Sequence, residues 1–563
     1  MPATSPVVRL VCLMLVGFLS GPWLAFSAVV PTTTLTNDQL ATRFLAQATF
    51  GPSPDGLAEL RALNYDYGAW ITREAAKPVS SAVTVLTTAR NAGQIDTIDT
   101  ALNRRARNQI MISASDQLRQ RVAYALSQIM VISDVDSAVA NGLEGPSGYY
   151  DMLARNALGS FHTLLMDVTR HPMMGRYLSH YKNRMANQTT GTRPDENYAR
   201  EVMQLFAIGL YQLQPNGNYV TDTSGRPLET YTNEDITEFA RVFTGFTDEG
   251  PNNTGTGTGR LDFPSNPANY VAPMRMWEAQ HDKGSKRLLQ YTGATKSILP
   301  ANQPGLQDVQ DAITNLVEHP STAPFISRQL IQRLVTSNPS EGYIARVAAV
   351  FVNNGNGVRG DLLAVVRAIL LDSEARSTSF IADPEHGRLR EPFLRVTHLL
   401  RATRYTVTDG ILNFNFGNTV TPTTIGHYPL SSPSVFNFYS PDFEPPGPVA
   451  NAGLVGPEFQ ILNSVFAVTL PNTLNTIIQT GAGNFRLNIS DLEGMAANAQ
   501  TLLDHLDLMF THGTMSIESK AVIRRAVDGV TAAMVPSGSN LNQTRARLAL
   551  YLVVNSPDYA ILK

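Results

Sequence analysis

Cysteine is almost absent from this chain of 563 residues, and its single copy, Cys12, lies near the N-terminus. If the segment around Cys12 is removed on export, the mature protein has no thiol. Disulfide bonds, thiolate metal sites, iron–sulfur clusters and cysteine nucleophiles are then excluded together. No apolar stretch precedes Cys12, which argues against a lipid-modified cysteine.

Charge is also scarce. Charged residues make up 16% of the chain, the formal net charge is −3, and like charges never form a run. A nucleic-acid binder needs a basic face, so the composition argues against a nucleic-acid partner. The hydrophobic content of 43% is that of an ordinary globular protein. The length suffices for one large domain or two medium domains.

Several catalytic and cofactor motifs are missing. The chain has no G-x-S-x-G nucleophile elbow, no H-E-x-x-H zinc helix and no glycine–lysine phosphate loop. Gly255–Gly259 lacks the flanking strand and helix of a dinucleotide site. Glu278-x-x-His281 is the only such pair, whereas a di-iron bundle needs two. The cofactor is therefore unknown, and a divalent metal ion stays open.

The only long hydrophobic run lies at the N-terminus. Arg9 precedes the apolar stretch 10–19, and Ala25 and Ser27 offer small residues for cleavage. This pattern predicts a signal peptide over 1–27, followed by a linker over 28–35, and hence a periplasmic or secreted protein. An uncleaved anchor is the alternative. No later run is long enough to predict a membrane span.

Helical periodicity dominates the rest of the chain. Thr36 and Gln39 form a capping box before one helix, and Ser53-Pro54 starts the next. Further helices are expected near 118–132, 150–170, 173–181, 194–208, 233–243, 306–318, 321–335, 341–352, 360–372, 390–403, 456–467, 495–510, 516–533 and 541–555. The predicted fold is predominantly all-α: a large multi-helical domain with long loops rich in proline, glycine and asparagine, and at most short β-hairpins.

The predicted loops and boundaries are few. Residues 252–259 are expected to be mobile, and 431–448 to cross the surface in extended conformation. Short strands are expected near 219–220 and 411–416. One domain is predicted over 36–563, with a subdivision into lobes 36–298 and 299–563 left open.

The segment 193–206 is the most informative. Pro194 stands where a helix would start, and Asp195 and Glu196 follow it. Helical spacing places a polar set on one arc, and it contains no lysine. We expect this arc to form an interlocked, partly buried hydrogen-bond network. The polar arc comprises Arg193, Glu196, Asn197, Arg200, Glu201 and Gln204; the apolar arc comprises Tyr198, Val202, Leu205 and Phe206.

This segment, RPDENYAREVMQLFAIGLYQL, resembles the central motif of the bacterial family called domain of unknown function 1800. Other segments match the family in the same order and cover nearly all of the mature chain. They include ATRFLAQATFGPSP, LRQRVAYALSQIMVIS, YTNEDITEFARVFTGF, HPSTAPFISRQLIQRLVTSNPS, LREPFLRVTHLLRA and SPSVFNFYSPDF. The resemblance implies an exported helical protein of unassigned activity. It also implies a possible exported partner that resembles sulfatases, because such a family is often encoded nearby.

Other polar residues could complete a site. The helix after Thr232 repeats the pattern, with Glu238 and Arg241 on one face, for which a surface ion pair is the plainer interpretation. The pair His281 and Asp282 suits proton transfer or metal binding. Asp167 and His171 stand four residues apart at the end of a predicted helix. A histidine there usually stabilises the helix end, held by the aspartate.

Two classes of function follow. The first is a hydrolase-like enzyme acting on an envelope or extracellular polymer, with polysaccharide as one possibility, in which helix-borne carboxylates serve as acid and base. The second is a non-catalytic binding or assembly protein that presents an exposed apolar patch, for which 431–448 is the candidate segment. A divalent-metal site on the same residues is a third possibility. The candidate residues are Glu196, Glu201, Arg200, Asn197, Asp195, His281 and Asp282, supported by Glu238, Arg241, Asp167 and His171.

Overall fold

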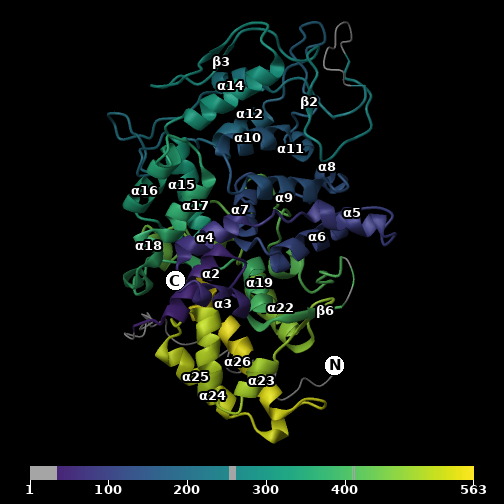
Figure 1. The fold of residues 1–563 in the computed structure, drawn as a ribbon. Coiled ribbons are helices and arrows are strands. Elements are labelled where there is room, and N and C mark those ends of the chain that lie inside the picture. Colours follow the sequence, from purple (N-terminus) through teal and green to yellow (C-terminus); the bar gives the residue numbers. More distant parts are fainter. Residues whose placement is uncertain (1–33, 253–261, 409, 411) are drawn as a thin grey trace.

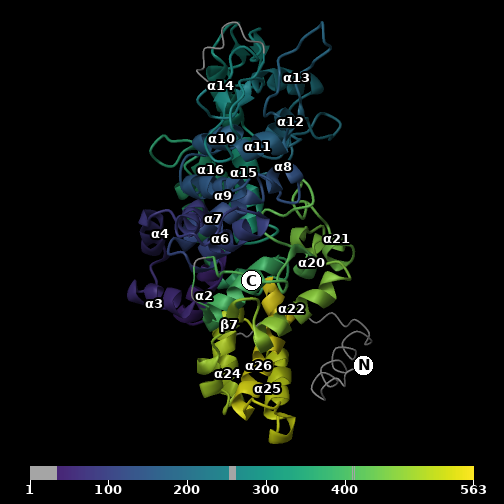
Figure 2. The same ribbon diagram turned by 90° about the vertical axis from the view of Figure 1, so that its right-hand side faces the viewer.

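The computed structural model describes residues 34–563, apart from 253–261, 409 and 411. The predicted signal peptide and most of the segment expected to be mobile lie outside the described residues. Helices dominate the described part, where strands form only two-stranded antiparallel sheets. The prediction of a predominantly all-α fold is confirmed. Figures 1 and 2 show an elongated molecule with α12, α13 and α14 toward one end and α24, α25 and α26 at the other.

The first helices start as their sequences predict. Thr36 and Gln39 form the expected capping box at the start of α2 (Asn37–Ala48), and Ser53 caps α3 (Pro54–Ala62). Three helices that the sequence pattern did not indicate follow, among them α6, which buries Asn103 and Arg107 beside its apolar residues. The helices of this region after α3 are α4 (Tyr67–Ala76), α5 (Ala82–Asn91), α6 (Thr100–Ser113), α7 (Gln117–Ser127), α8 (Ser137–Ala140) and α9 (Gly145–Asn156).

The next region holds the predicted site. The prediction of a single helix over 150–170 is wrong. Helix α9 ends at Asn156, and Ser160, which also bridges to Asp361, caps a new helix. The helices here are α10 (Phe161–Arg170), α11 (Pro172–Tyr177), α12 (Asn197–Gln204), α13 (Asn233–Val242) and α14 (Gly305–Glu318). The sheets pair β1 (Phe246–Thr247) with β2 (Arg275–Met276), and β3 (Lys286–Arg287) with β4 (Ile298–Leu299).

Residues 322–403 return to the middle of the molecule. Here α15 packs against α7 and α17 packs against α4, while α14 packs against α10 and α13. Elements on both sides of residue 299 thus share one hydrophobic core. The elements of this region are α15 (Thr322–Leu334), α16 (Glu341–Val352), α17 (Leu362–Leu371), α18 (Ser373–Arg376), the 3-10 turn η1 (Thr378–Ile381), β5 (Arg388–Leu389) and α19 (Pro392–Thr403).

The last region forms the opposite end of the molecule. The prediction of a helix over 456–467 is wrong. The side chain of Asn463 accepts from the backbone N–H groups of Val465 and Phe466, and the helix starts only at Phe466. The elements are β6 (Tyr405–Val407), α20 (Pro422–Ile425), α21 (Pro448–Asn451), η2 (Pro457–Gln460), α22 (Phe466–Thr480), β7 (Phe485–Leu487), α23 (Ser490–Met495), α24 (Ala499–Leu506), the π-turn η3 (Asp507–Thr511), α25 (Ile517–Asp528), η4 (Ala532–Met534), α26 (Leu541–Val554), α27 (Pro557–Ala560) and β8 (Ile561–Leu562).

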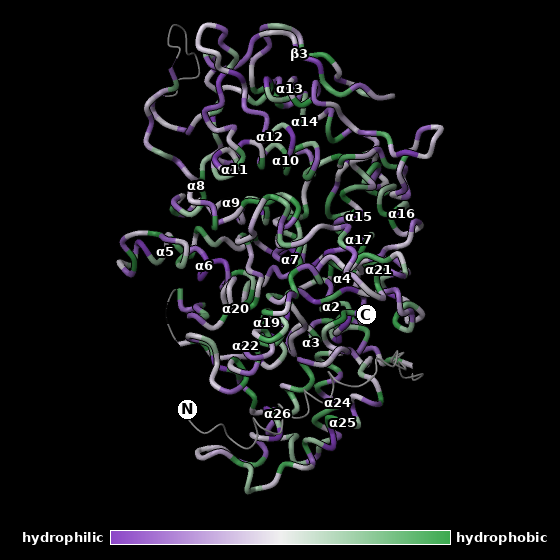
Figure 3. Tube along the Cα trace, turned by 180° about the vertical axis from the view of Figure 1, so that it is seen from behind, coloured by the Kyte–Doolittle hydropathy of each residue, from purple (hydrophilic) through white to green (hydrophobic). Residues whose placement is uncertain are grey.

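Pairing of distant strands ties this region to the middle. Strand β6 pairs with β7, and β8 pairs with β5, so that Arg388 lies opposite Leu562. Of the expected strands, 219–220 contributes isolated bridges such as Leu213 to Tyr219, and 412–416 forms no strand. Hydrophobic and hydrophilic positions alternate along the helices of all four regions (Figure 3).

Candidate functional site

The predicted site helix, α12, starts three residues later than expected. The side chain of Asn183 pairs with the backbone of Asp195 at 2.8 and 3.2 Å, which holds this segment out of helical conformation. Asp195 then accepts from the backbone N–H of Asn197, where the helix begins. Pro194 is therefore not the first helical residue. Arg193 and Glu196 precede the regular helix, so helical spacing does not govern their contacts.

The apolar arc of α12 is placed as predicted, but its polar arc is not interlocked. Tyr198 and Phe206 are wholly buried, and the ring of Tyr198 lies 3.9 Å from that of His180. In the described part of the chain, no ion pair involves Arg193 or Arg200. Glu196 is exposed and accepts from the hydroxyl of Thr237 at 2.9 Å. The expectation of an arginine–carboxylate network on α12 is therefore wrong.

Glu201 is the unusual member of this arc. Glu201 is only 5% exposed, and its buried Oε2 has no hydrogen-bond partner among the described residues. Burial raises the pKa of Glu201, and the positive charge of Arg200 only partly offsets this. Tyr177 and Tyr231 lie within electrostatic reach of the carboxyl group. An acid in this environment favours its protonated form, as a general acid requires.

The second predicted helix, α13, carries a compact ion-pair bridge. Thr232 and Asp235 form the predicted capping box at its start. Arg241 donates to both oxygens of Glu238 at 2.8 and 2.9 Å, and to both oxygens of Asp282 at 3.0 Å. Burial alone would raise the pKa of Asp282, but hydrogen bonds from Arg241 outweigh it and lower that pKa. The bridge fixes the loop after β2 onto α13.

Arg241→Gln is expected to lower the free energy of unfolding by about 1–2 kcal/mol, since it removes charge-assisted hydrogen bonds from two partly buried carboxylates. Because the folded pKa of Asp282 lies below its ordinary value of 3.8, this stabilisation is present above about pH 4 and is lost as the pH falls further. Guanidinium unfolding of both proteins at neutral pH and near pH 3 measures the difference. An equal difference at both pH values would contradict the assignment.

His281 and Asp282 are adjacent in sequence but take separate roles. His281 is wholly buried; its Nδ1 lies 3.0 Å from the carbonyl oxygen of Thr244, and its Nε2 lies 3.0 Å from Asp308. Asp308 also accepts from the buried ammonium group of Lys286 at 2.6 Å. Both ring nitrogens of His281 are thus occupied by oxygen atoms within the fold. Asp308, which the sequence pattern did not single out, lies downstream on α14.

Asp167 and His171 do not contact each other through a hydrogen bond. Asp167 accepts from Asn156 at 2.9 Å, and His171 accepts from the backbone N–H of Met173 at the start of α11. Burial lowers the pKa of His171 to about 3, so the ring is neutral. The expected Asp–His contact at the helix end is therefore wrong, because the chain turns into α11 and uses the imidazole as its cap.

The predicted residues therefore gather in two groups. Glu196 contacts α13 through the hydroxyl group of Thr237. Glu201 lies on α12, next to Arg200. Glu238, Arg241 and Asp282 form the bridge at the far end of α13. Within the described ranges, no group of three or more His, Cys, Asp or Glu side chains is arranged to hold a metal ion.

The most extensive buried polar network lies elsewhere, around Glu391 at the start of α19. Glu391 is wholly buried and accepts from Tyr124, from Gln128 at 2.8 Å, from Arg388 at 2.5 Å and from Tyr439 at 3.2 Å. Arg388 also binds Glu458 at 2.8 Å. These residues come from segments far apart in the sequence, which the network joins.

Electrostatics hold this network in its charged form at Glu391. Burial alone would raise the pKa of Glu391, but Arg388, His427 and Arg121 lower it to about 2. Burial lowers the pKa of His427 to about 4. Tyr439 shows that the segment 431–448 does not simply cross the surface, since its hydroxyl reaches Gln128 at 2.8 Å inside the core.

Sequence reasoning did not select the Glu391 network, although a signal was present. Arg388, Glu391 and Pro392 lie within five residues of one another, so a cation and an acid stand just before the proline that starts a helix. The partners that bury this acid lie tens to hundreds of residues away. Periodicity within one segment cannot reveal them.

One protein family model matches nearly the whole chain. Residues 43–561 match the family model described as Protein of unknown function (DUF1800). The chain belongs to the DUF1800 family. Searches among curated proteins and among solved structures found no match. The Glu391 network is where four segments that carry the DUF1800 resemblance meet; they supply Tyr124, Arg333, Glu391 and Tyr439.

None of the helices of this DUF1800 protein, within the residues that the structure describes, is long and apolar enough to cross a lipid bilayer.

Proposed function

We propose that this DUF1800 protein is an exported hydrolase-like enzyme that acts on an envelope or extracellular polymer, with Glu201 as the general acid. The observation that supports this proposal is the buried carboxyl group of Glu201, whose Oε2 has no hydrogen-bond partner in the described chain. A group used only to stabilise the fold would normally find such a partner. Burial raises the pKa of this acid, which is the direction that suits a group that protonates a leaving group.

Glu196 is the proposed base. It is exposed, lies five residues before Glu201 at the start of α12, and accepts a single side-chain hydrogen bond from Thr237. In the proposed reaction, Glu201 gives its proton to the oxygen atom of the leaving group while Glu196 takes a proton from the attacking water. Arg200 lies beside Glu201 and would orient the substrate with Asn197. Two carboxyl groups with different environments are the arrangement that acid–base hydrolysis uses.

The alternative is a non-catalytic assembly protein that works with a sulfatase-like partner. That function requires a continuous exposed apolar patch, which we expected on 431–448. Phe436, which is 57% exposed, is the only large hydrophobic residue of this described segment on the surface. A single exposed ring is ordinary for a protein surface. We therefore rank the enzyme first.

Assays against a panel of envelope and extracellular polysaccharides test the proposal. We expect release of reducing ends that falls on the basic side of its pH profile, where Glu201 loses its proton. Because burial raises the pKa of Glu201, the basic limb should lie above the ordinary glutamate value of 4.5. Absence of hydrolysis of every polymer between about pH 4 and pH 9 would reject the enzyme proposal.

A further inference from the structure

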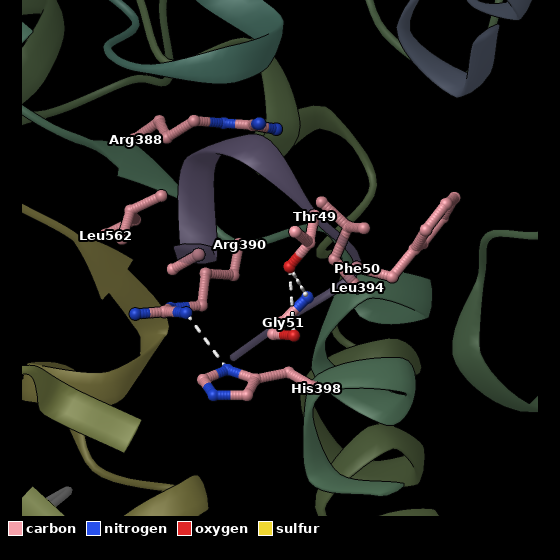
Figure 4. A pocket seen from close by; sticks show the side chains of 9 residues that line it. Thr49, Phe50, Gly51, Arg388, Arg390, Leu394, His398 and Leu562 are labelled. Carbon is pink, nitrogen blue, oxygen red and sulfur yellow. Dashed lines mark hydrogen bonds between the residues drawn. The ribbon is translucent and has the colours of Figure 1, made fainter. Parts of the chain in front are cut away.

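A small cavity of about 20 Å³ lies between the end of α2, the start of α19 and the β5–β8 strand pair. Figure 4 shows Arg390 and His398 at one side of it and Thr49 with Gly51 at another. Gly51 has a φ of +122°, and a Cβ there would come within 2.6 Å of the His398 backbone. The close approach of these two backbones fixes one wall of the cavity. The other lining residues are Ala46, Phe50, Arg388, Leu394 and Leu562.

Arg390 brings a positive charge to this cavity. It is 6% exposed, and its guanidinium group donates to His398 at 3.1 Å, to His512 at 2.9 Å and to the carbonyl oxygen of Phe510 at 3.2 Å. Its buried Nε has no hydrogen-bond partner in the described chain. Leaving this N–H group unpaired on a buried cation costs free energy. One more acceptor at the Nε would therefore stabilise the folded protein.

The two histidines solvate Arg390 but do not neutralise it. An arginine only donates, so the ring nitrogens that face it, Nδ1 of His398 and Nε2 of His512, must accept. The opposite nitrogen of His398, Nε2, lies 2.9 Å from the carbonyl oxygen of Met509, to which it donates. Both rings are therefore neutral. Burial and the nearby Arg390 lower the pKa of each well below its ordinary value.

No carboxylate compensates Arg390. Within the described residues, it takes part in no ion pair. Its neighbour Arg388 differs, because that guanidinium group is bound by both Glu391 and Glu458. Arg388 thus has its counter-ions within the fold, whereas Arg390 has only neutral partners. Burying a charge without a counter-ion costs free energy. Arg333 and Arg395 are also buried without an ion pair among the described residues, but neither of them lines the cavity.

We propose that this cavity binds one halide-sized inorganic anion, such as chloride or bromide, as the buried counter-ion of Arg390. The size of the cavity suits a single water-sized sphere, which excludes phosphate, sulfate and carboxylate ligands. The Nε of Arg390 supplies the donor, and the aliphatic side chains of Leu394 and Leu562 suit a weakly hydrated ion. This site is separate from the proposed hydrolytic site on α12 and does not depend on it.

Thermal unfolding of the full chain in different sodium salts tests the proposal. Protein prepared in sodium gluconate is titrated with sodium bromide or chloride at constant ionic strength. Because an ion that binds only the folded state stabilises it by mass action, we expect a saturable rise in Tm of about 1 °C or more with either halide. Identical Tm values in gluconate and in both halides would overturn the proposal.

Two variants locate the effect. Arg390→Met should abolish the response of Tm to halide. Arg395→Met is the comparison, because Arg395 lies on the same α19, is equally buried at 6% exposure, binds the carbonyl oxygen of Val554 and does not line the cavity, although its charge also acts on Arg390. It should retain the response. A response that survives in Arg390→Met, or is lost in Arg395→Met alone, places the ion elsewhere and overturns the assignment.

Should Arg390→Met fail to fold, crystals of the wild-type protein grown in sodium bromide decide the matter. We expect an anomalous bromide peak within about 3.5 Å of the Nε of Arg390. Density without anomalous signal at that position would identify a water molecule and overturn the proposal.

Discussion

Glu201→Gln is expected to lower the proposed hydrolytic kcat by about 10²- to 10⁴-fold, the usual contribution of a general acid. Glutamine keeps the shape of the side chain but has no proton to give. Because Oε2 of Glu201 has no hydrogen-bond partner in the described chain, the substitution breaks no internal hydrogen bond at this atom. Steady-state kinetics on the polymer found in the assays above measure the loss.

The same variant should be at least as stable as the wild-type protein. The pKa of Glu201 is raised in the folded state, so the folded protein holds this proton more tightly than the unfolded chain. Wild-type stability therefore falls as the pH rises above about 4.5 and through the folded pKa, whereas glutamine does not titrate. Relative to wild type, the variant should gain stability with rising pH, which thermal unfolding between acid and neutral pH can follow.

Glu229→Gln is the matched control for Glu201→Gln. Replacing Glu229 by glutamine removes the same charge. Like Glu201, Glu229 raises the pKa of Tyr231, but it is exposed. Its kcat should stay near that of the wild type. If Glu201→Gln lost stability at neutral pH in proportion to its activity, Glu201 would be a structural residue and the catalytic assignment would fail.

Glu391→Gln should lower the free energy of unfolding by about 3–5 kcal/mol, because it leaves the buried guanidinium group of Arg388 with one carboxylate in place of two. Since the folded pKa of Glu391 is about 2, below its ordinary value of 4.5, the contribution is present above about pH 4.5. It is lost as the pH falls toward 2. Guanidinium unfolding at neutral pH and at about pH 3 should show a smaller difference at the lower pH.

Glu385→Gln provides the comparison for Glu391→Gln. Glu385 lies six residues earlier on the exposed surface, so its change should stay within about 0.5 kcal/mol. A loss at Glu391 no larger than that at Glu385 would show that Arg388 is adequately compensated by Glu458 alone.

Local signals predicted much of the fold. The capping boxes at Thr36 and Thr232 and the proline start of α3 formed as expected, because a cap depends on atoms three residues apart. The buried arc of α12 also followed from spacing. Helix α6 was missed because its buried face carries Asn103 and Arg107, whose burial depends on distant partners. Arg107 reaches Asp134 at 3.1 Å, beyond the next helix.

The candidate site was predictable only in part. The sequence pointed to α12 and α13 but assigned their polar residues to one interlocked network. Asn183, twelve residues upstream, holds Asp195 out of the helix, so the expected spacing did not apply. His281 was a reasonable candidate by residue type, yet its two ring nitrogens face Thr244 and Asp308 inside the core.

The sequence by itself determined the all-α class, most helix starts and the DUF1800 resemblance, because these depend on periodicity, capping and ordered local motifs. Only the tertiary structure decided which charges are compensated. Within the described residues, Oε2 of Glu201 lacks a hydrogen-bond partner, Glu391 has four, and Arg390 has only neutral ones. The free energy of a buried charge depends on whatever lies within a few ångströms of it, and in this chain those neighbours come from segments up to hundreds of residues away.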